Sequence, residues 1–187
     1  MSAFAESGTV SPSTGARPTS MRRVLVIGCG GAGKSTFARV LGRLAALPVV
    51  HLDQEYWHPA WIATPAEVWE RQIARLIESD RWILDGNYGG TLAPRLAACD
   101  TVILLDLPRA LCLWRVIKRG WRYRGRARPE TREGCPERLS WQFVHWIWTY
   151  RRRRRPAIAA RLGALRADQR AVVLRTRAEV AAFLGGE

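Results

Sequence analysis

A glycine-rich run near the start of the chain constrains the fold more than any other feature. Residues 28–35 read Gly-Cys-Gly-Gly-Ala-Gly-Lys-Ser, which fits the pattern G-x-x-x-x-G-K-[ST] at every fixed position. The short apolar run Arg23–Ile27 precedes it, and apolar residues at helical spacing follow it over Lys34–Ala46. A strand, a glycine-rich turn and a helix in this order form a P-loop, which binds the phosphates of a nucleotide.

This loop predicts a site for ATP with Mg²⁺ as its cofactor. Glycines let the backbone turn its N–H groups toward the phosphates, and the following helix adds the positive end of its dipole. Lys34 is expected to reach the β- and γ-phosphates, and the hydroxyl of Ser35 to ligate Mg²⁺. The predicted nucleotide-binding residues are Gly28, Gly30, Gly31, Ala32, Gly33, Lys34, Ser35 and Thr36.

Strands and helices alternate along the rest of the chain. Further strands are expected at Val49–Leu52, Trp82–Asp85, Thr101–Asp106 and Ala171–Leu174, with helical patterns between them. This alternation predicts a three-layer α/β fold with a five-stranded parallel sheet, covered by helices on both faces. Ligands of such sheets bind beyond the carboxyl ends of the strands.

Length and composition favour one domain. The chain has 187 residues, which suits a single domain over residues 22–187. Residues 1–21 show no periodicity and read as a disordered tail without the features of a secretory signal. The four cysteines form no CxxC pair, so we expect free thiols and a cytoplasmic protein. No apolar run approaches the ~18 residues of a membrane span, and we expect no membrane partner.

Three aspartates end or follow predicted strands. Asp85 is expected to hold Mg²⁺ through water, because a P-loop enzyme needs a carboxylate near its serine. Asp53 is expected to act as a base or as an anchor for the acceptor. Asp106 precedes Pro108 and fits helix capping better. Capping or turn formation is also the alternative reading of Asp53 and Asp85.

Positive charge is concentrated in one quarter of the chain. The net charge is +14, and residues 109–155 contain fifteen arginines or lysines against three glutamates. Such a balance implies a polyanionic partner: nucleotide phosphates, nucleic acid, or both. Residues 120–138 are polar, basic and without periodicity, which predicts a mobile, arginine-rich lid.

Several blocks in order resemble the bacterial topology-modulation-protein family of adenylate-kinase-like P-loop proteins. They are GCGGAGKST, HLDQEYWHPAW, WILDGNYGGTLAPRL, DTVILLDLPRALCLWRVIKR and GCPERL, and the resemblance covers about residues 22–187. It implies the strand order 2-3-1-4-5 and a helical lid. The family's old name also carries an association with DNA topology.

The resemblance also assigns roles to single residues. Arg115 and Arg119 match lid arginines that close on phosphates, and they share a helix face because they are four residues apart. Asp53 stands where uridine and shikimate kinases place an aspartate on an acceptor hydroxyl. Asn87, in the DGNY block, and Arg95, just after it, are expected to contact the acceptor.

Aromatic residues complete the predicted site. Tyr56 and Trp57 follow Asp53 and are expected to stack on an acceptor ring. Packing in the core is the expected role of another set: Trp69, Trp82, Trp114, Trp141 and Trp148. His51 is expected to be structural.

Together these patterns predict an ATP-dependent phosphotransferase. It would transfer the γ-phosphoryl group to a small acceptor, a nucleotide or nucleoside first, using Lys34, Asp53, Asp85, Arg115 and Arg119. A nucleotide-regulated, nucleic-acid-binding ATPase is the alternative, because the basic segment at 109–155 would also suit a nucleic acid. A switch that only hydrolyses ATP is a third possibility.

Overall fold

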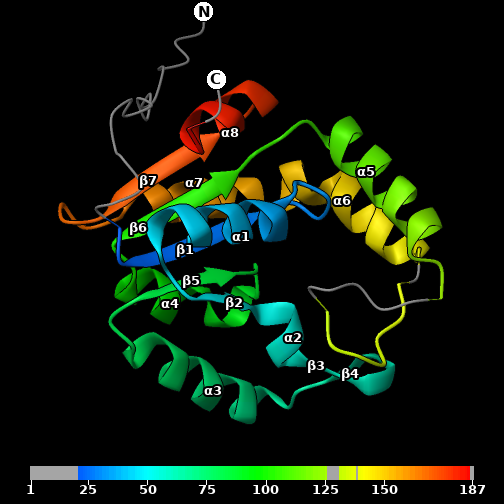
Figure 1. Ribbon diagram of the computed structural model, residues 1–187, viewed down its shortest axis with the longest axis horizontal. Helices are drawn as coiled ribbons and strands as arrows, with labels where there is room; N and C mark the ends of the chain where they lie inside the picture. Colours follow the sequence, from blue (N-terminus) through cyan, green and yellow to red (C-terminus); the bar gives the residue numbers. More distant parts are fainter. Residues whose placement is uncertain (1–20, 126–130, 138, 186–187) are drawn as a thin grey trace, which may run out of the picture.

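A parallel five-stranded sheet forms the centre of the molecule. The computed structural model describes residues 21–125, 131–137 and 139–185. The strands are β1 (Arg23–Gly28), β2 (Val49–His51), β5 (Trp82–Asp85), β6 (Thr101–Leu105) and β7 (Arg170–Leu174) (Figure 1). Their order across the sheet is β2-β5-β1-β6-β7, with every pair parallel. The expected three-layer α/β fold is confirmed.

Two short strands lie outside the central sheet. β3 (Trp57–His58) and β4 (Ile62–Ala63) pair antiparallel and form a separate hairpin. A short helix, α2 (Leu52–Tyr56), leads into this hairpin, and a 3₁₀ turn, η2 (Pro59–Trp61), forms its tip. The sequence patterns predicted none of these pieces. The expected order 2-3-1-4-5 counted only the long strands, whereas the labels used here also count β3 and β4.

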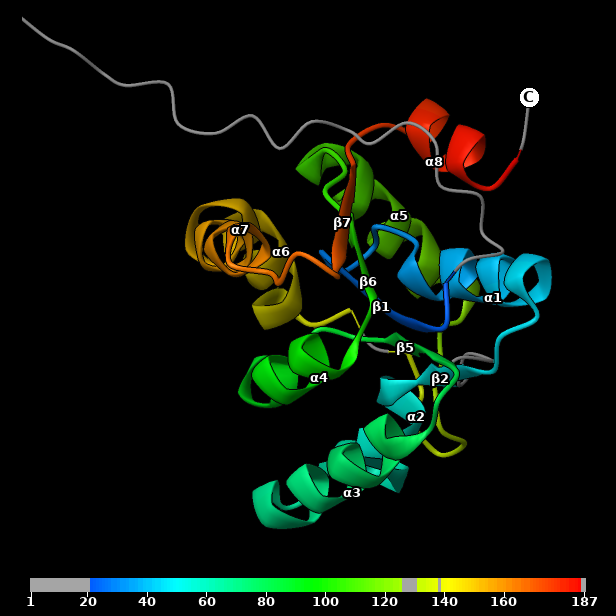
Figure 2. The same cartoon turned by 90° about the vertical axis from the view of Figure 1, so that its left-hand side faces the viewer.

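Helices cover both faces of the sheet. Figure 2 shows α1 (Lys34–Ala45) and α8 (Arg177–Phe183) on one face. The other face carries α4 (Leu92–Ala98), α6 (Trp141–Arg153) and α7 (Arg155–Gly163). Beyond β2 lies α3 (Ala66–Glu78), which packs on α4, and η3 (Gly89–Thr91) leads into α4. The long helix α5 (Arg109–Arg122) packs against α6 at one end of the molecule.

The core lies between these layers. β1, β5 and β6 are almost wholly buried, as expected for central strands of a parallel sheet. The four cysteines are free and buried. Met21, the last residue assigned to the tail, is also buried in the core, whereas residues 1–20 lie outside the described part.

The prediction that five tryptophans pack in the core is wrong for three of them. Trp69 and Trp82 are buried, but Trp114 and Trp148 are more than half exposed, and Trp141 is 81% exposed. Their helical spacing indicated an amphipathic face correctly. That face is turned outward because the opposite faces of α5 and α6 pack onto the P-loop.

The predicted lid is only partly described. Helix α5 continues to Arg122, so the irregular part begins at Tyr123. Arg126, Arg128 and the rest of 126–130, together with residue 138, fall outside the described residues. Within the described ranges, no helix is long and apolar enough to cross a membrane.

Candidate active site

The register of the sheet brings the predicted site residues to one edge. In the strand pairing, Val26 lies opposite Asp85, and His51 lies opposite Asp85 from the other side. β1 therefore ends in the P-loop directly beside the ends of β2 and β5. A cavity of about 890 Å³ opens at this edge, and residues 30–36 of the P-loop line it, as do Asp53 and Asp85.

Lys34 and Ser35 begin α1 and line the cavity. The ammonium of Lys34 donates a hydrogen bond to the carbonyl of Cys29 at 3.0 Å, which keeps its side chain folded over the loop. Gly28, predicted to bind the nucleotide, lies outside the cavity lining. Its N–H donates to Oδ1 of Asn87 at 3.0 Å, and its carbonyl accepts from Nδ2 of Asn87 at 2.8 Å. Asn87 thus anchors the start of the loop while also lining the cavity.

Helices α5 and α6 pack closely against the glycines of the P-loop. A Cβ atom at Gly31 would lie 2.3 Å from the carbonyl oxygen of Cys112 in α5, and one at Gly30 would lie 2.7 Å from the ring of Phe143 in α6. A side chain at Gly31 would meet backbone, whereas one at Gly30 would have to displace the ring of Phe143. The thiol of Cys29, in the same loop, is buried. Its hydrogen bond with Cys112, together with burial, raises the pKa of the Cys29 thiol, so this thiol stays protonated.

Asp85 is the buried carboxylate of the site. Its Oδ2 lies 2.9 Å from Nδ1 of His51, and only 5% of the residue is exposed. Since a carboxylate accepts hydrogen bonds, Nδ1 of His51 carries the proton. Oδ1 of Asp85 is buried without a hydrogen-bond partner among the described residues. A buried carboxylate oxygen of this kind fits a water-mediated Mg²⁺ ligand, with Ser35 on the same cavity.

Among the described residues, Asp85 is not part of a cluster of metal-binding side chains. Across residues 21–125, 131–137 and 139–185, no group of three or more His, Cys, Asp or Glu side chains could hold a metal ion. A P-loop does not need one, because Mg²⁺ is held there by the serine, a carboxylate and the phosphates. The residues present therefore fit Mg²⁺ that arrives with a nucleotide.

Asp53 lies in the first turn of α2 and faces the cavity. The hydroxyl of Tyr88 donates to its Oδ1 at 2.6 Å. Burial, and then the neighbouring charge of Asp53, raise the pKa of Tyr88, so the phenol keeps its proton and remains a donor. The hydrogen bond from Tyr88 holds Oδ1 of Asp53 in place, and Oδ2 is the other acceptor oxygen of the carboxylate.

The sequence predicted that Arg95 contacts the acceptor, but Arg95 is not among the residues that line the cavity. The side chain is fully buried. Its guanidinium donates to the carbonyls of Gly86 at 2.8 Å, Asn87 at 2.6 Å and Tyr88 at 2.7 Å, and to that of Thr91 at 3.0 Å. Through these hydrogen bonds Arg95 fixes the backbone of the loop that carries Asn87 and Tyr88.

The two predicted aromatic contacts differ. Trp57 lines the cavity. Tyr56 is absent from the lining residues, because its ring packs between Trp57, Trp69 and Tyr88 with centroid distances of 4.7–5.1 Å. Tyr56 supports the wall of the cavity and Trp57 forms part of its surface.

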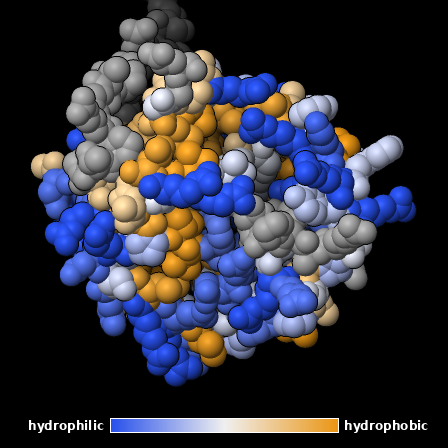
Figure 3. Space-filling model, viewed as in Figure 1, coloured by the Kyte–Doolittle hydropathy of each residue, from blue (hydrophilic) through white to orange (hydrophobic). Residues whose placement is uncertain are grey.

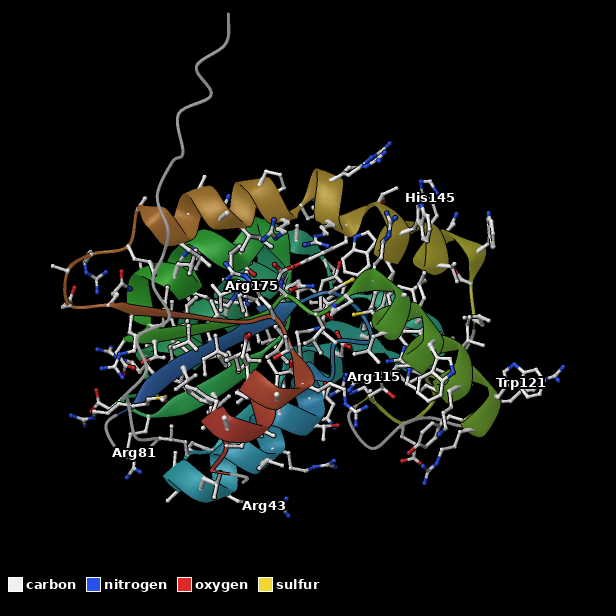
Figure 4. All side chains as sticks on the ribbon, turned by 90° about the horizontal axis from the view of Figure 1, so that it is seen from above. Arg43, Arg81, Arg115, Trp121, His145 and Arg175 are labelled. Atoms are coloured by element: carbon white, nitrogen blue, oxygen red, sulfur yellow. The ribbon has the colours of Figure 1, made fainter. Side chains whose placement is uncertain are left out.

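The two predicted arginines of α5 both reach the cavity. Nη1 of Arg115 donates to the carbonyl of Ala32 at 3.1 Å, so its guanidinium rests on the P-loop (Figure 4). Nε of Arg119 donates to the buried carboxylate of Glu137 at 2.8 Å. Arg115 therefore contacts the P-loop, whereas Arg119 connects α5 to Glu137 in the lid region.

The described part of the lid region docks on the β3–β4 hairpin. The indole N–H of Trp61 donates to the carbonyl of Pro136 at 3.0 Å. The amide of Ala60 donates to the carbonyl of Gly134 at 2.9 Å, and the thiol of Cys135 donates to the carbonyl of His58 at 3.1 Å. Hydrogen bonds therefore hold together two segments that lie far apart in the sequence.

Sequence reasoning missed several lining residues. α8 contributes Arg177, Val180 and Ala181, Leu184 directly follows α8, and α6 contributes Phe143 and Trp146. The periodicity predicted both helices, but no signal in the sequence indicates that they face the P-loop. His51 was expected to be merely structural; its place opposite Asp85 follows from strand register, which periodicity does not give.

The chain resembles known proteins in its structure but matches none of them by sequence. No protein-family model matches the chain, and no curated protein matches it by sequence. The fold is similar to shikimate kinase from Acinetobacter baumannii in complex with shikimate, with a TM-score of 0.54 and 18% identity, over 89% of this chain and 90% of that one. It is also similar to a sugar kinase from Janibacter sp. HTCC2649, with a TM-score of 0.50 and 18% identity, over 88% and 91%. At this identity the likeness shows a P-loop kinase-like fold.

Proposed function

We propose that this protein is a kinase that transfers the γ-phosphoryl group of ATP to a small acceptor. One observation carries the proposal: residues 30–36 of the P-loop share a single cavity with two carboxylates and four arginines, two of which are Arg115 and Arg119. Phosphoryl transfer needs positioning and charge compensation more than covalent chemistry. The site supplies both from residues on five different elements.

Each residue has a defined task in this proposal. The N–H groups of residues 30–36 and Lys34 bind the phosphates, and Ser35 and Asp85 hold Mg²⁺, which neutralises charge on the phosphates when it is bound. Arg115 and Arg119 compensate the charge of the transferred group. The apolar residues of α8 lie on the side of the P-loop away from Asp53 and would receive the base of ATP.

Asp53 would orient the acceptor and accept its proton. An acceptor oxygen attacks the γ-phosphorus, the bond from that phosphorus to the bridging β–γ oxygen breaks, and the acceptor proton passes to Asp53. Trp57 offers a flat surface beside Asp53 for a ring. A nucleoside or nucleotide is therefore our first acceptor class, in keeping with the resemblance to the topology-modulation family.

The second candidate function is a nucleotide-regulated, nucleic-acid-binding ATPase, which rests on the basic segment 109–155. Two arginines of that segment already pair with carboxylates, which makes them less available to a nucleic acid: Arg119 with Glu137, and Arg155 with Asp106 at 2.7 Å. Acceptor-independent release of phosphate would favour the hydrolytic alternatives over the kinase.

The deciding experiment is transfer from γ-labelled ATP with Mg²⁺ across nucleosides, nucleoside monophosphates and small hydroxylated metabolites. We expect a labelled product from one acceptor class. Lys34→Ala, the blank, should fold but transfer nothing, and Asp53→Asn should bind ATP without transferring. Free phosphate as the sole product, or full activity in Lys34→Ala, would contradict the proposal.

A further inference from the structure

Large apolar side chains are exposed together on one side of the molecule. In the described residues, six of the nine exposed large hydrophobic side chains lie between positions 114 and 148. They are Trp114, Ile117, Trp121, Leu139, Trp141 and Trp148, which we call the outer face. Trp121 and Trp141 are each 81% exposed. Exposed tryptophans in such number on one surface indicate an interaction site.

Helical spacing aligns these residues into two stripes. In α5, Trp114, Ile117 and Trp121 recur at intervals of three and four, and in α6 Trp141 and Trp148 lie two turns apart. The opposite sides of both helices press on the P-loop through Cys112 and Phe143. The stripes therefore point away from the active site, and Figure 4 shows Trp121 directed outward at the far end of α5.

The two stripes form one surface. A Cβ atom at Gly120, near the end of α5, would lie 3.5 Å from Leu139, just before α6. At the other end, the guanidinium of Arg109 lies 4.1 Å from the ring centroid of Trp148. The helices thus run antiparallel and side by side, and their outward sides join into one face.

Cations surround the apolar residues. The ammonium of Lys118 lies 5.0 Å from the ring centroid of Trp114, and Arg122 is exposed one residue after Trp121. Arg151–Arg153 are exposed at the end of α6. Of the two glutamates described in this region, Glu137 is buried against Arg119. In Figure 3, hydrophilic side chains gather, with hydrophobic ones between them, over the right-hand part of the molecule, where α5 and α6 lie in Figure 1.

We propose that the outer face binds the surface of an anionic lipid bilayer. Tryptophan prefers the interface between headgroups and acyl chains, and flanking arginines and lysines are attracted to anionic lipids. The helices would lie in the plane of the membrane, with the active site turned away from it. This departs from the expectation of no membrane partner, which rested on the lack of a spanning segment.

Two observations favour lipid over other partners. A second copy of the chain would bring two basic faces together, and like charges repel. Single-stranded nucleic acid is usually held in a basic groove with stacking platforms, whereas none of the six residues of the outer face lines the active-site cavity. Its exposed aliphatic residues, Ile117 and Leu139, have no role in stacking but suit an acyl interface.

Vesicle binding tests the proposal with the full chain. We expect co-sedimentation with phosphatidylcholine vesicles that contain phosphatidylglycerol to exceed that with pure phosphatidylcholine by at least about tenfold at ~150 mM salt. The double variant Trp121→Ala/Trp141→Ala should lose about tenfold in partitioning. Leu44→Ala, which shortens an exposed side chain on α1 outside the outer face, is the matched control and should bind like the wild type.

Further readouts separate the outcomes. Brominated lipids should quench the fluorescence of the wild type more than that of the double variant. The charge variant Lys118→Glu/Arg122→Glu should also lose binding, and each variant should keep its thermal shift with ATP. Equal binding to both vesicle types, an unaffected double variant, or tighter binding to a single-stranded oligonucleotide than to anionic vesicles would overturn the proposal.

Discussion

At the scale of the residue, Arg95 shows how a buried charge can shape an active site without entering it. Burying a guanidinium is costly unless every donor finds an acceptor. Arg95 meets that cost with four backbone carbonyls, and burial lowers its pKa only to about 10, so it stays charged at neutral pH. These bonds hold Tyr88, whose φ of 30° is unfavourable for a residue with a side chain.

Replacing Arg95 by methionine should therefore destabilise the protein and loosen the site. It leaves several buried carbonyls unpaired, and we expect the free energy of unfolding in urea to fall by about 2–4 kcal/mol. The control is Arg81→Met, which removes an exposed hydrogen bond to the carbonyl of Ala46 and should cost less than about 0.5 kcal/mol. Similar losses in both variants would show that Arg95 contributes no more than a surface arginine.

His51 is predicted to position the magnesium carboxylate. Without its N–H, Asp85 would lose the partner of Oδ2. We expect His51→Ala to raise the Mg²⁺ concentration needed for half-maximal phosphoryl transfer by about 10- to 100-fold, as for other partners of metal ligands. His51→Asn keeps a donor at the position of Nδ1 and should recover part of the loss. An unchanged Mg²⁺ dependence in His51→Ala would remove this role.

At the scale of the element, α5 and α6 determine the shape of the P-loop as much as β1 and α1 do. Gly31 has a φ of 78° and faces the carbonyl of Cys112. Its conformation is open to glycine at no cost, but a side chain there is strained and also meets the backbone of α5. The phosphate cradle therefore depends on a helix that starts almost eighty residues later in the chain.

Gly31→Ala should disturb this contact. The added Cβ would lie 2.3 Å from the carbonyl oxygen of Cys112, so α5 or the loop must move. We expect ATP binding, measured by calorimetry, to weaken by at least about tenfold, and the free energy of unfolding to fall by about 2 kcal/mol. Gly89→Ala, where no atom lies within 4 Å of the new carbon, should leave ATP binding unchanged; a comparable loss there would mean that the contact with α5 is irrelevant.

The elements that local sequence specifies were predictable, and those set by distant contacts were not. The strand before the P-loop, the helix after it and the carboxylate of Asp85 each follow from neighbouring residues. The burial of Arg95 was not predictable, because a guanidinium that donates to carbonyls looks the same in sequence as one that binds a ligand. The outward tryptophans were misassigned because periodicity gives a face but not its direction.

At the scale of the whole molecule, the cavity joins the two ends of the described chain. P-loop residues follow the first strand, whereas Val180 and Ala181 belong to the last helix, and both groups line the same space. A nucleotide bound there would contact elements that otherwise meet only through the sheet. Ligand binding should therefore stabilise the entire fold and not only the loop.

Thermal unfolding measures this coupling directly. A ligand at one hundred times its Kd stabilises the folded state by about 2.7 kcal/mol. For a domain of this size each kcal/mol raises Tm by about 2–4 °C, so Mg²⁺ with ATP should raise Tm by about 5–11 °C. Lys34→Ala should unfold near the wild-type temperature alone and show almost no shift with ATP, because its loop is intact but its phosphate contact is lost. A full shift in Lys34→Ala would instead mean that the nucleotide is bound through its base and through Arg115, with the P-loop lysine reserved for the transfer step.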